Sequence, residues 1–210
     1  MTEARVPKPT RTTPPKPPVS YDEFLEWADE DTRAEWVDGD IIFMSPISDA
    51  HQDIVEFFLT LLRVHVEHHG EGWVRSSTFF QMKLDVIPSG REPDIVYLRE
   101  EHRDRMTGTY IDGPADLTVE VVSPESGPRD RGEKFYEYEA AGVPEYWLVD
   151  PDREELLVYR LQDDRYKIAF EGREGRVDSA VVDRFWIEAE WLWQETLPPV
   201  LDVLSELGLV

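Results

Sequence analysis

The chain has 210 residues, with 22 Lys and Arg against 45 Asp and Glu, a formal net charge of −23 and no cysteine. This length suits one domain with a sizeable core, and the lack of cysteine excludes a disulfide scaffold and cysteine-ligated zinc. No apolar run approaches the ~20 residues of a membrane-spanning helix, and no apolar leader follows Met1, so we expect a cytoplasmic protein without membrane contact.

The first 19 residues are rich in proline and carry four of the chain's Lys and Arg residues. Such a composition cannot bury enough apolar surface to build a core. We therefore expect residues 1–19 to be a disordered or extended basic tail and residues 20–210 to form a single domain. The tail could contact phosphates, although an unstructured terminus without a role is the more common case.

The folded part is expected to begin with a short helix and a hairpin. Ser20 and Glu23 have the spacing of a capping box, which predicts a helix to about Ala28. An Asp-Gly dipeptide at residues 38–39, between two runs of β-forming residues, predicts a tight β-hairpin over residues 34–44.

The longest helix is expected to run from the cap Ser48 to about His69, with Gly70 at its end, because apolar residues recur along one face between them. Residues 73–87 predict one or two strands, and residues 88–90 predict a turn.

A further strand is expected over residues 93–98, entered through Pro93 and with Asp94 at its start. Residues 99–114 are charged and contain two glycines. We expect them to form a loop of a length that often serves function.

The stretch from residue 117 to 151 predicts a strand, a turn, a helix and a second strand. Leu117, Val119 and Val121 alternate with polar and other positions, which places Glu120 on the opposite face of the first strand. The acid therefore interrupts an apolar segment, and a carboxylate in that position needs a partner.

The helix of this stretch is expected to begin at Asp130, which has capping-box spacing to Glu133, and to end at Gly142 and Pro144. Asp130 is interpreted as a helix cap in preference to a metal ligand. The length of the connection suits two parallel strands.

The remaining elements favour an α/β or α+β domain with a mixed central β-sheet flanked by helices. They are a hairpin between residues 146–149 and 155–161 that residues 166–170 extend, strands over 177–182 and 185–193, and a helix over 197–207 with Pro198 and Pro199 in its first turn.

Three charged residues on consecutive elements suggest chemistry. Glu120 lies in an apolar strand, and Lys134 lies in the first turn of the expected helix, where the helix dipole disfavours a cation. Both positions become favourable when the two groups face one another or share a metal. With Asp94 nearby, two acids could hold Mg²⁺ while the lysine orients a water or stabilises phosphoryl oxygens.

At these residues the sequence resembles the PD-(D/E)XK nuclease superfamily and, more closely, its Uma-two family of restriction endonuclease-like proteins. The matching phrases are Glu35-Trp-Val-Asp-Gly39, Met44-Ser-Pro46 with His51, Pro93-Asp94-Ile-Val, Val119-Glu-Val-Val-Ser-Pro124, Asp130 with Lys134, and Gly142-Val-Pro-Glu-Tyr-Trp-Leu-Val-Asp150.

The resemblance implies a restriction-endonuclease-like core in which Asp94 and Glu120 bind Mg²⁺ or Mn²⁺. It departs from the superfamily pattern at Val122, where a lysine would stand two residues after the acid. The resemblance implies that Lys134 takes its place. Glu35 and His51 are supporting catalytic candidates, as additional ligands or as groups that orient the ligands.

Two other groups of residues have a functional and a structural interpretation. His65 and His69 stand four apart on one helix face and could bind a metal, but a polar helix end that complements the dipole is favoured. Trp186, Trp191 and Trp193 could stack on bases, but core or dimer contacts are favoured.

Three functions remain open from the sequence. The first is a Mg²⁺-dependent endonuclease that hydrolyses DNA, which would favour a homodimer because two strands are cut. The second is a non-catalytic interaction or regulatory module on the nuclease scaffold, which Val122 and the net charge of −23 favour because a polyanion is repelled at long range. The third is a small phosphoesterase, which suits an acidic surface better.

Overall fold

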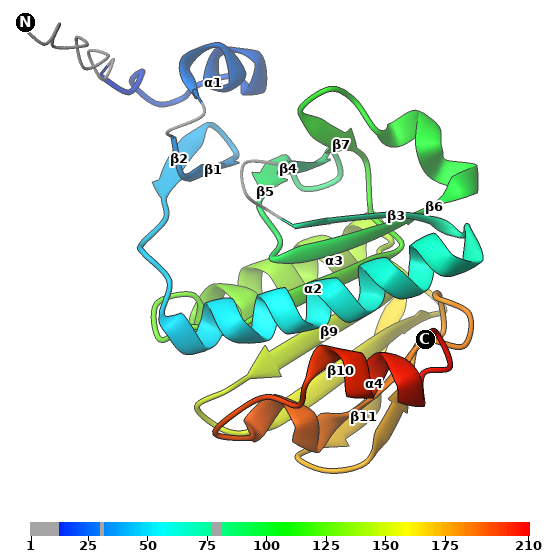
Figure 1. The fold of residues 1–210 in the computed structure, drawn as a ribbon. Coiled ribbons are helices and arrows are strands. Elements are labelled where there is room, and N and C mark those ends of the chain that lie inside the picture. Colours follow the sequence, from blue (N-terminus) through cyan, green and yellow to red (C-terminus); the bar gives the residue numbers. More distant parts are fainter. Residues whose placement is uncertain (1–12, 30–31, 77–80) are drawn as a thin grey trace, which may run out of the picture.

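The computed structural model describes residues 13–29, 32–76 and 81–210, which form a mixed α+β fold around two sheets (Figure 1). The helices are α1 Tyr21–Trp27, α2 Asp49–His69, α3 Lys134–Ala141 and α4 Val200–Glu206. The strands are β1 Ala34–Val37, β2 Asp40–Phe43, β3 Gly72–Ser76, β4 Gln81–Leu84, β5 Ser89–Arg91, β6 Ile95–Arg99, β7 Tyr110–Asp112, β8 Leu117–Val121, β9 Glu145–Asp150, β10 Glu155–Gln162, β11 Arg165–Gly172, β12 Arg176–Asp178 and β13 Trp186–Glu188.

The six-stranded sheet has the order β11-β10-β9-β8-β6-β3 and is the mixed central sheet that the sequence predicts. Its strands β8 and β9 are parallel, joined by the α3 crossover, and its other pairs are antiparallel. Strand β8 is buried on both faces at the centre of the sheet. A polar side chain on β8 must therefore find its partners inside the protein.

Helix α2 covers one face of this sheet, and α3 lies on the other (Figure 1). Leu117, Val119 and Val121 face α2, so the alternation that places Glu120 on the opposite face is confirmed. That opposite face packs against α3 and against β4 and β7 of the second sheet, through a cluster that includes Met82, Tyr138, Tyr146 and Leu148.

The second sheet has the order β2-β1-β5-β4-β7 and adjoins the α3 side of the central sheet. Its hairpin β1–β2 turns at Asp38 and Gly39, whose φ angles of 46° and 91° fit the left-handed turn that an Asp-Gly pair favours. Helix α1 packs on this sheet through Tyr21 and Phe24. Strand β1 supplies Glu35 to the interior.

Several predicted boundaries are confirmed. Both reciprocal hydrogen bonds of the capping box between Ser20 and Glu23 are present, and α1 ends at the C-cap Ala28. Helix α2 has Ser48 as its N-cap and the left-handed Gly70 as its C-cap. In these segments local hydrogen bonding and periodicity favour the same structure as the tertiary fold.

Other predicted elements differ from the structure. The turn over 88–90 is wrong because Ser89–Arg91 is β5, and the loop over 99–114 contains a 3₁₀ helix at Glu100–Arg105 and strand β7. The strand expected over 185–193 is the short β13 followed by a 3₁₀ helix at Ala189–Trp193. Helix α4 begins only after its cap Pro199.

The expected tail lies partly outside the described residues, since the first described residue is Thr13. Val19 is 3% exposed, its N–H donates to Gly39 O at 2.9 Å, and its carbonyl accepts from Trp36 Nε1 at 2.7 Å. The packed part of the chain therefore includes Val19. Among the described residues, the helices are too short or too polar to cross a bilayer.

Candidate active site

Lys134 is the centre of a buried charge cluster. Its side chain is 2% exposed, and its Nζ lies 2.9 Å from Glu120 Oε1, 3.3 Å from Glu35 Oε1 and 3.4 Å from Asp130 Oδ1. These three acids come from β8, from β1 and from the turn before α3. One ammonium therefore contacts carboxylates from three separate parts of the chain.

Glu120 is held in one orientation by two donors. Lys134 Nζ and the Tyr138 hydroxyl, which lies one turn further along α3, both donate to Glu120 Oε1, at 2.9 Å and 2.7 Å. The acid is 3% exposed. Because both donors use Oε1, these two bonds leave Oε2 available as a ligand atom.

Asp94 precedes β6, the neighbour of β8, and reaches the same site. Its Oδ2 accepts from the Val121 N–H at 2.7 Å and lies 3.3 Å from His51 Nε2 on α2. Burial alone would lower the pKa of His51, but the Asp94 carboxylate outweighs it and raises that pKa. His51 is therefore close enough to Asp94 to orient its carboxylate.

A fully buried arginine connects the second sheet to the cluster. Arg91 Nη1 donates to Glu35 Oε2 at 2.9 Å, and its Nε donates to Glu137 Oε2 at 2.8 Å. Glu35 Oε1 also accepts from the Glu92 N–H at 3.1 Å. Burial alone would raise the pKa of Glu35, but Lys134 and Arg91 outweigh it and lower that pKa.

The interpretation of Asp130 as a helix cap is wrong. The helix begins earlier, at residue 127, and the N–H of Asp130 already donates to Ser126 O at 2.9 Å within a π-helical turn, Arg129–Glu133. Within this turn Asp130 lies in the interior, where it is 1% exposed, and its carboxylate accepts no hydrogen bond, although Oδ1 lies 3.4 Å from Lys134 Nζ.

Acids outnumber cations around Lys134, and this imbalance and the burial of the cluster shift the pKa values of its members. Burial raises the pKa of Glu120 well above its usual value, and the neighbouring Asp130 and Asp94 add to the rise while Lys134 opposes it. Burial also raises the pKa of Asp130. Burial alone would lower the pKa of Lys134, but the surrounding carboxylates raise it, so the amine stays charged.

Asp94, Glu120 and Lys134 line one polar pocket of about 40 Å³. Within the described ranges, no three His, Asp or Glu side chains are arranged to hold a metal ion by themselves. The donor set nevertheless suits Mg²⁺, which commonly takes one or two carboxylates and completes its coordination with water and substrate phosphate. Neither carboxylate oxygen of Asp130 accepts a hydrogen bond, although Oδ1 lies 3.4 Å from Lys134 Nζ, so the buried acids of this region can accommodate a further cation.

The five residues predicted from the sequence meet in this region. Four of them line the pocket, namely His51, Asp94, Glu120 and Lys134. Glu35 does not line it but contacts Lys134. The sequence predicts a helix cap at Asp130 and does not identify Arg91 or Tyr138 as residues of the site. The spacing of Asp130 and Tyr138 four residues before and after Lys134 could have indicated their contacts, since such residues share a helix face. Nothing in its local pattern marks Arg91 as buried.

The other candidate groups have structural partners. His65 is buried, and its Nε2 lies 2.8 Å from Asp183 O. Trp191 is buried in the α2-side core, and Trp186 and Trp193 pack against it. These contacts agree with the structural interpretation of both groups.

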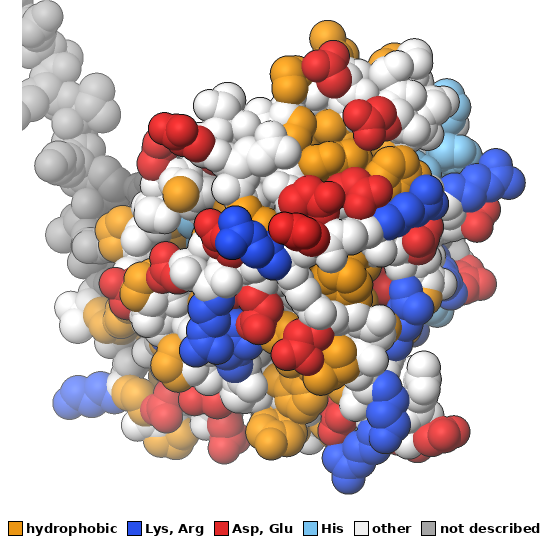
Figure 2. Space-filling view, turned by 90° about the horizontal axis from the view of Figure 1, so that it is seen from below, with side chains coloured by type: hydrophobic (Ala, Val, Ile, Leu, Met, Phe, Trp, Pro, Cys, Tyr) orange, Lys and Arg blue, Asp and Glu red, His pale blue; other side chains and the backbone are white. Residues whose placement is uncertain are grey.

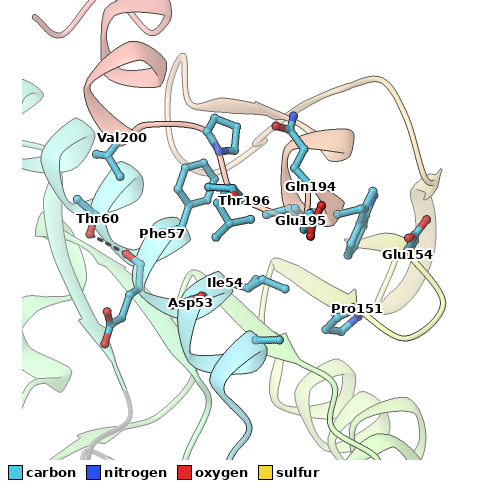
Figure 3. A pocket seen from close by; sticks show the side chains of 16 residues that line it. Asp53, Ile54, Phe57, Thr60, Pro151, Glu154, Gln194, Glu195, Thr196 and Val200 are labelled. Atoms are coloured by element: carbon cyan, nitrogen blue, oxygen red, sulfur yellow. Dashed lines mark hydrogen bonds between the residues drawn. The ribbon is translucent and has the colours of Figure 1, made fainter.

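A larger cavity lies away from Asp94 and Glu120. It has a volume of about 700 Å³ and lies between the start of α2 and residues 192–200 (Figure 3). Phe57 and Ile54 point into it from α2 (Figure 3), and none of the predicted site residues lines it. The small polar pocket is therefore the candidate active site, because convergent charged groups indicate chemistry better than volume does.

The molecular surface shows no extended basic tract on the face seen from below. Acidic and basic side chains alternate there with apolar ones (Figure 2). This face therefore offers a polyanion no extended electrostatic attraction.

Comparison with known proteins agrees with the fold. The Uma2 family model, described as "Putative restriction endonuclease", matches residues 21–190. The uncharacterized protein slr1290 of Synechocystis is 30% identical over 154 residues, which are 71% of this chain and 78% of that protein. A crystal structure described as a putative nuclease belonging to DUF820, from Anabaena variabilis, superposes with a TM-score of 0.70 at 19% identity and covers 84% of this chain and 98% of that one.

Proposed function

We propose that the chain, which belongs to the Uma2 family of restriction endonuclease-like proteins, is a divalent-metal-dependent endonuclease that hydrolyses phosphodiester bonds of DNA. The observation that carries this proposal is the convergence of Asp94 and Glu120, from adjoining strands, with Lys134 in one polar pocket. The shared fold with a protein described as a putative nuclease supports it.

The proposed roles follow from the contacts. Asp94 and Glu120 would hold Mg²⁺ or Mn²⁺, which would polarise a phosphoryl oxygen and make a bound water more acidic. Lys134 stabilises negative charge on the phosphoryl oxygens or orients the attacking water. Glu35 and Asp130 position its ammonium, and Tyr138 positions Glu120.

A cleavage assay tests the proposal. Purified protein is incubated with plasmid DNA and Mg²⁺ or Mn²⁺ beside Glu120→Gln, which keeps the shape of the side chain but removes its charge. We expect the variant to nick at least about 100-fold more slowly, since a metal ligand is lost. Equal nicking by both proteins would show that the activity is a contaminant and would contradict the proposal.

Calorimetric titration of Mn²⁺ separates an active site from a retained scaffold. We expect binding to the wild-type protein that Asp94→Asn loses. No binding to either protein would favour the second candidate function, a non-catalytic interaction or regulatory module, which the missing lysine at Val122 and the net charge of −23 support.

The small volume of the pocket also favours a third candidate, a phosphoesterase for small substrates. A panel of chromogenic phosphate esters distinguishes it from the nuclease, because only the small esters would be turned over. A cytoplasmic location and a homodimer remain proposals. Sedimentation at several protein concentrations tests the dimer.

A further inference from the structure

Two arginines differ from every other arginine in the described part of the chain. The others donate to a carboxylate or a backbone carbonyl or lie in an ion pair. Arg33 and Arg129 have neither, and Arg129 Nε is shielded from solvent without an acceptor. In a chain with 45 Asp and Glu against 22 Lys and Arg, acids are available to pair with a guanidinium almost everywhere.

Both unpaired arginines lie at the same place. Arg33, in the connection between α1 and β1, and Arg129, at the start of the π-helical turn, line the polar pocket together with Asp94, Glu120 and Lys134. Arg33 also lines an adjoining cavity of about 400 Å³ that reaches Asp94 from the α2 side. The two guanidiniums therefore lie beside the acids without bonding to them.

Arg129 Nε is a shielded donor without an acceptor, which lowers the stability of the folded state unless a ligand supplies the acceptor. Arg33 is exposed, so its guanidinium borders the pocket from the solvent side and is free to meet an anion there. The acceptor that suits a guanidinium fork is a carboxylate or a phosphate, and the two arginines leave the carboxylates of the pocket unused. The pocket itself is too small for a nucleoside but can admit phosphate oxygens. An anion with tetrahedral oxygens fits these conditions.

We propose that Arg33 and Arg129 form a phosphate clamp that binds the phosphodiester next to the acids and so offsets the repulsion from the acidic protein. The inference rests on the proposed function for its substrate class, a phosphodiester in a nucleic-acid strand. The same chemistry would bind a small phosphodiester, and the experiment distinguishes the two sources.

The test measures binding without catalysis. A fluorescent DNA duplex is titrated with wild-type protein, Arg33→Gln and Arg129→Gln in EDTA, at several salt concentrations. The control is Arg63→Gln on α2, an exposed arginine paired with Glu67, which changes the net charge by the same amount. We expect each clamp variant to bind about tenfold more weakly and to lower the slope of log K against log salt by about 0.9, with no such change in the control.

A second arm uses bis(p-nitrophenyl) phosphate with Mn²⁺. Loss of hydrolysis in the clamp variants, without weaker DNA binding, would support the clamp and assign it to small esters. If both clamp variants match Arg63→Gln in both arms, or if the wild-type protein neither binds DNA nor hydrolyses the ester, the clamp is refuted.

The DNA arm excludes the metal and therefore measures binding alone. A wild-type protein that binds DNA through these arginines but cuts nothing would refute the proposed nuclease activity and leave the clamp standing. If Arg129→Gln does not fold, Arg129→Lys, which keeps the charge but not the fork, replaces it.

Discussion

At the residue scale, the buried charges of Arg91 and Lys134 are stable because each has several partners. Arg91 bonds to Glu35 and Glu137, and Lys134 contacts Glu35 as well. A buried ion pair contributes little net stability in itself, since desolvation opposes its attraction, but a broken one leaves an uncompensated charge. The carboxylate of Glu35 therefore couples the arginine to the amine of the site.

Substitution of Arg91 by Met should destabilise the protein by about 3–5 kcal/mol, because Glu137 and part of Glu35 lose their partner inside the core. Urea unfolding measures the change. Arg165→Met is the matched control, since Arg165 is largely exposed and pairs with Glu139 at 2.8 Å, and its loss should cost about 1 kcal/mol or less. Similar decreases in the free energy of unfolding in both variants would show that the buried Arg91 cluster matters no more to stability than an exposed ion pair.

A buried histidine should make the protein sensitive to mild acid. Burial lowers the pKa of His65 below its usual 6.5, so the unfolded state binds more protons as the pH falls below that value. Stability is therefore retained above pH 6.5 and lost as the pH falls toward the folded-state pKa.

His65→Gln keeps a donor for Asp183 O but cannot titrate, so its free energy of unfolding should fall less between pH 7.5 and pH 5.5 than that of the wild type. Urea titrations at both pH values measure this difference. His68→Gln, at an exposed position, should follow the wild type. If the free energy of unfolding of His65→Gln changes with pH as much as that of the wild type, His65 is not the source of the acid sensitivity.

The sequence identifies much of the site at this scale because acids and a lysine in apolar segments are conspicuous. Glu120 and Lys134 are unfavourable locally, and each finds the other at 2.9 Å. Arg91 could not be identified in this way, since a short strand between turn residues gives no periodic signal of burial.

At the element scale, the crossover from β8 through α3 to β9 carries most of the site. The π-helical turn before α3 displaces Asp130 toward Lys134, and Gly142 closes the helix with a φ of 84°. Sequence rules predict the closing glycine but not the wide turn. A π-helical turn is rare and has no simple local sequence signal that would predict it.

Two glycines of this crossover make a matched pair. An added Cβ would meet nothing within 4 Å at either Gly132 or Gly142, but only Gly142 has the left-handed φ of 84°. Gly142→Ala should destabilise the protein by about 1 kcal/mol, whereas Gly132→Ala should be neutral or stabilise it by up to about 1 kcal/mol. Thermal unfolding of the two variants measures this, and equal shifts would contradict it.

At the scale of the whole molecule, the mixed central sheet follows from the order of strongly patterned segments. The parallel pairing of β8 and β9 agrees with the length of their connection. The second sheet could not be predicted, because β5 and β7 are three residues each, and the sheet depends on the pairing of β5 with β1 and of β7 with β4 across intervening elements. Such short strands are defined by their partners and have little pattern of their own.

The proposed tail and domain boundary can be tested by truncation. Removal of residues 1–12 should change the free energy of unfolding by less than about 0.5 kcal/mol, since their composition cannot build a core. Removal of residues 1–19 should cost about 1–3 kcal/mol, because buried Val19 and its two backbone hydrogen bonds are lost. Equal effects would place the edge of the fold elsewhere.

The position of Lys134 between two sheets has one further consequence. Glu35 belongs to the β2-β1-β5-β4-β7 sheet and Glu120 to the central one, so a single ammonium bridges the seam between them. Any opening of that seam would separate the amine from one of its acids while the central sheet stays folded. The Glu35–Lys134 contact would thus hold the two sheets together at the site. On warming, activity should be lost at a lower temperature than the one at which the whole protein unfolds.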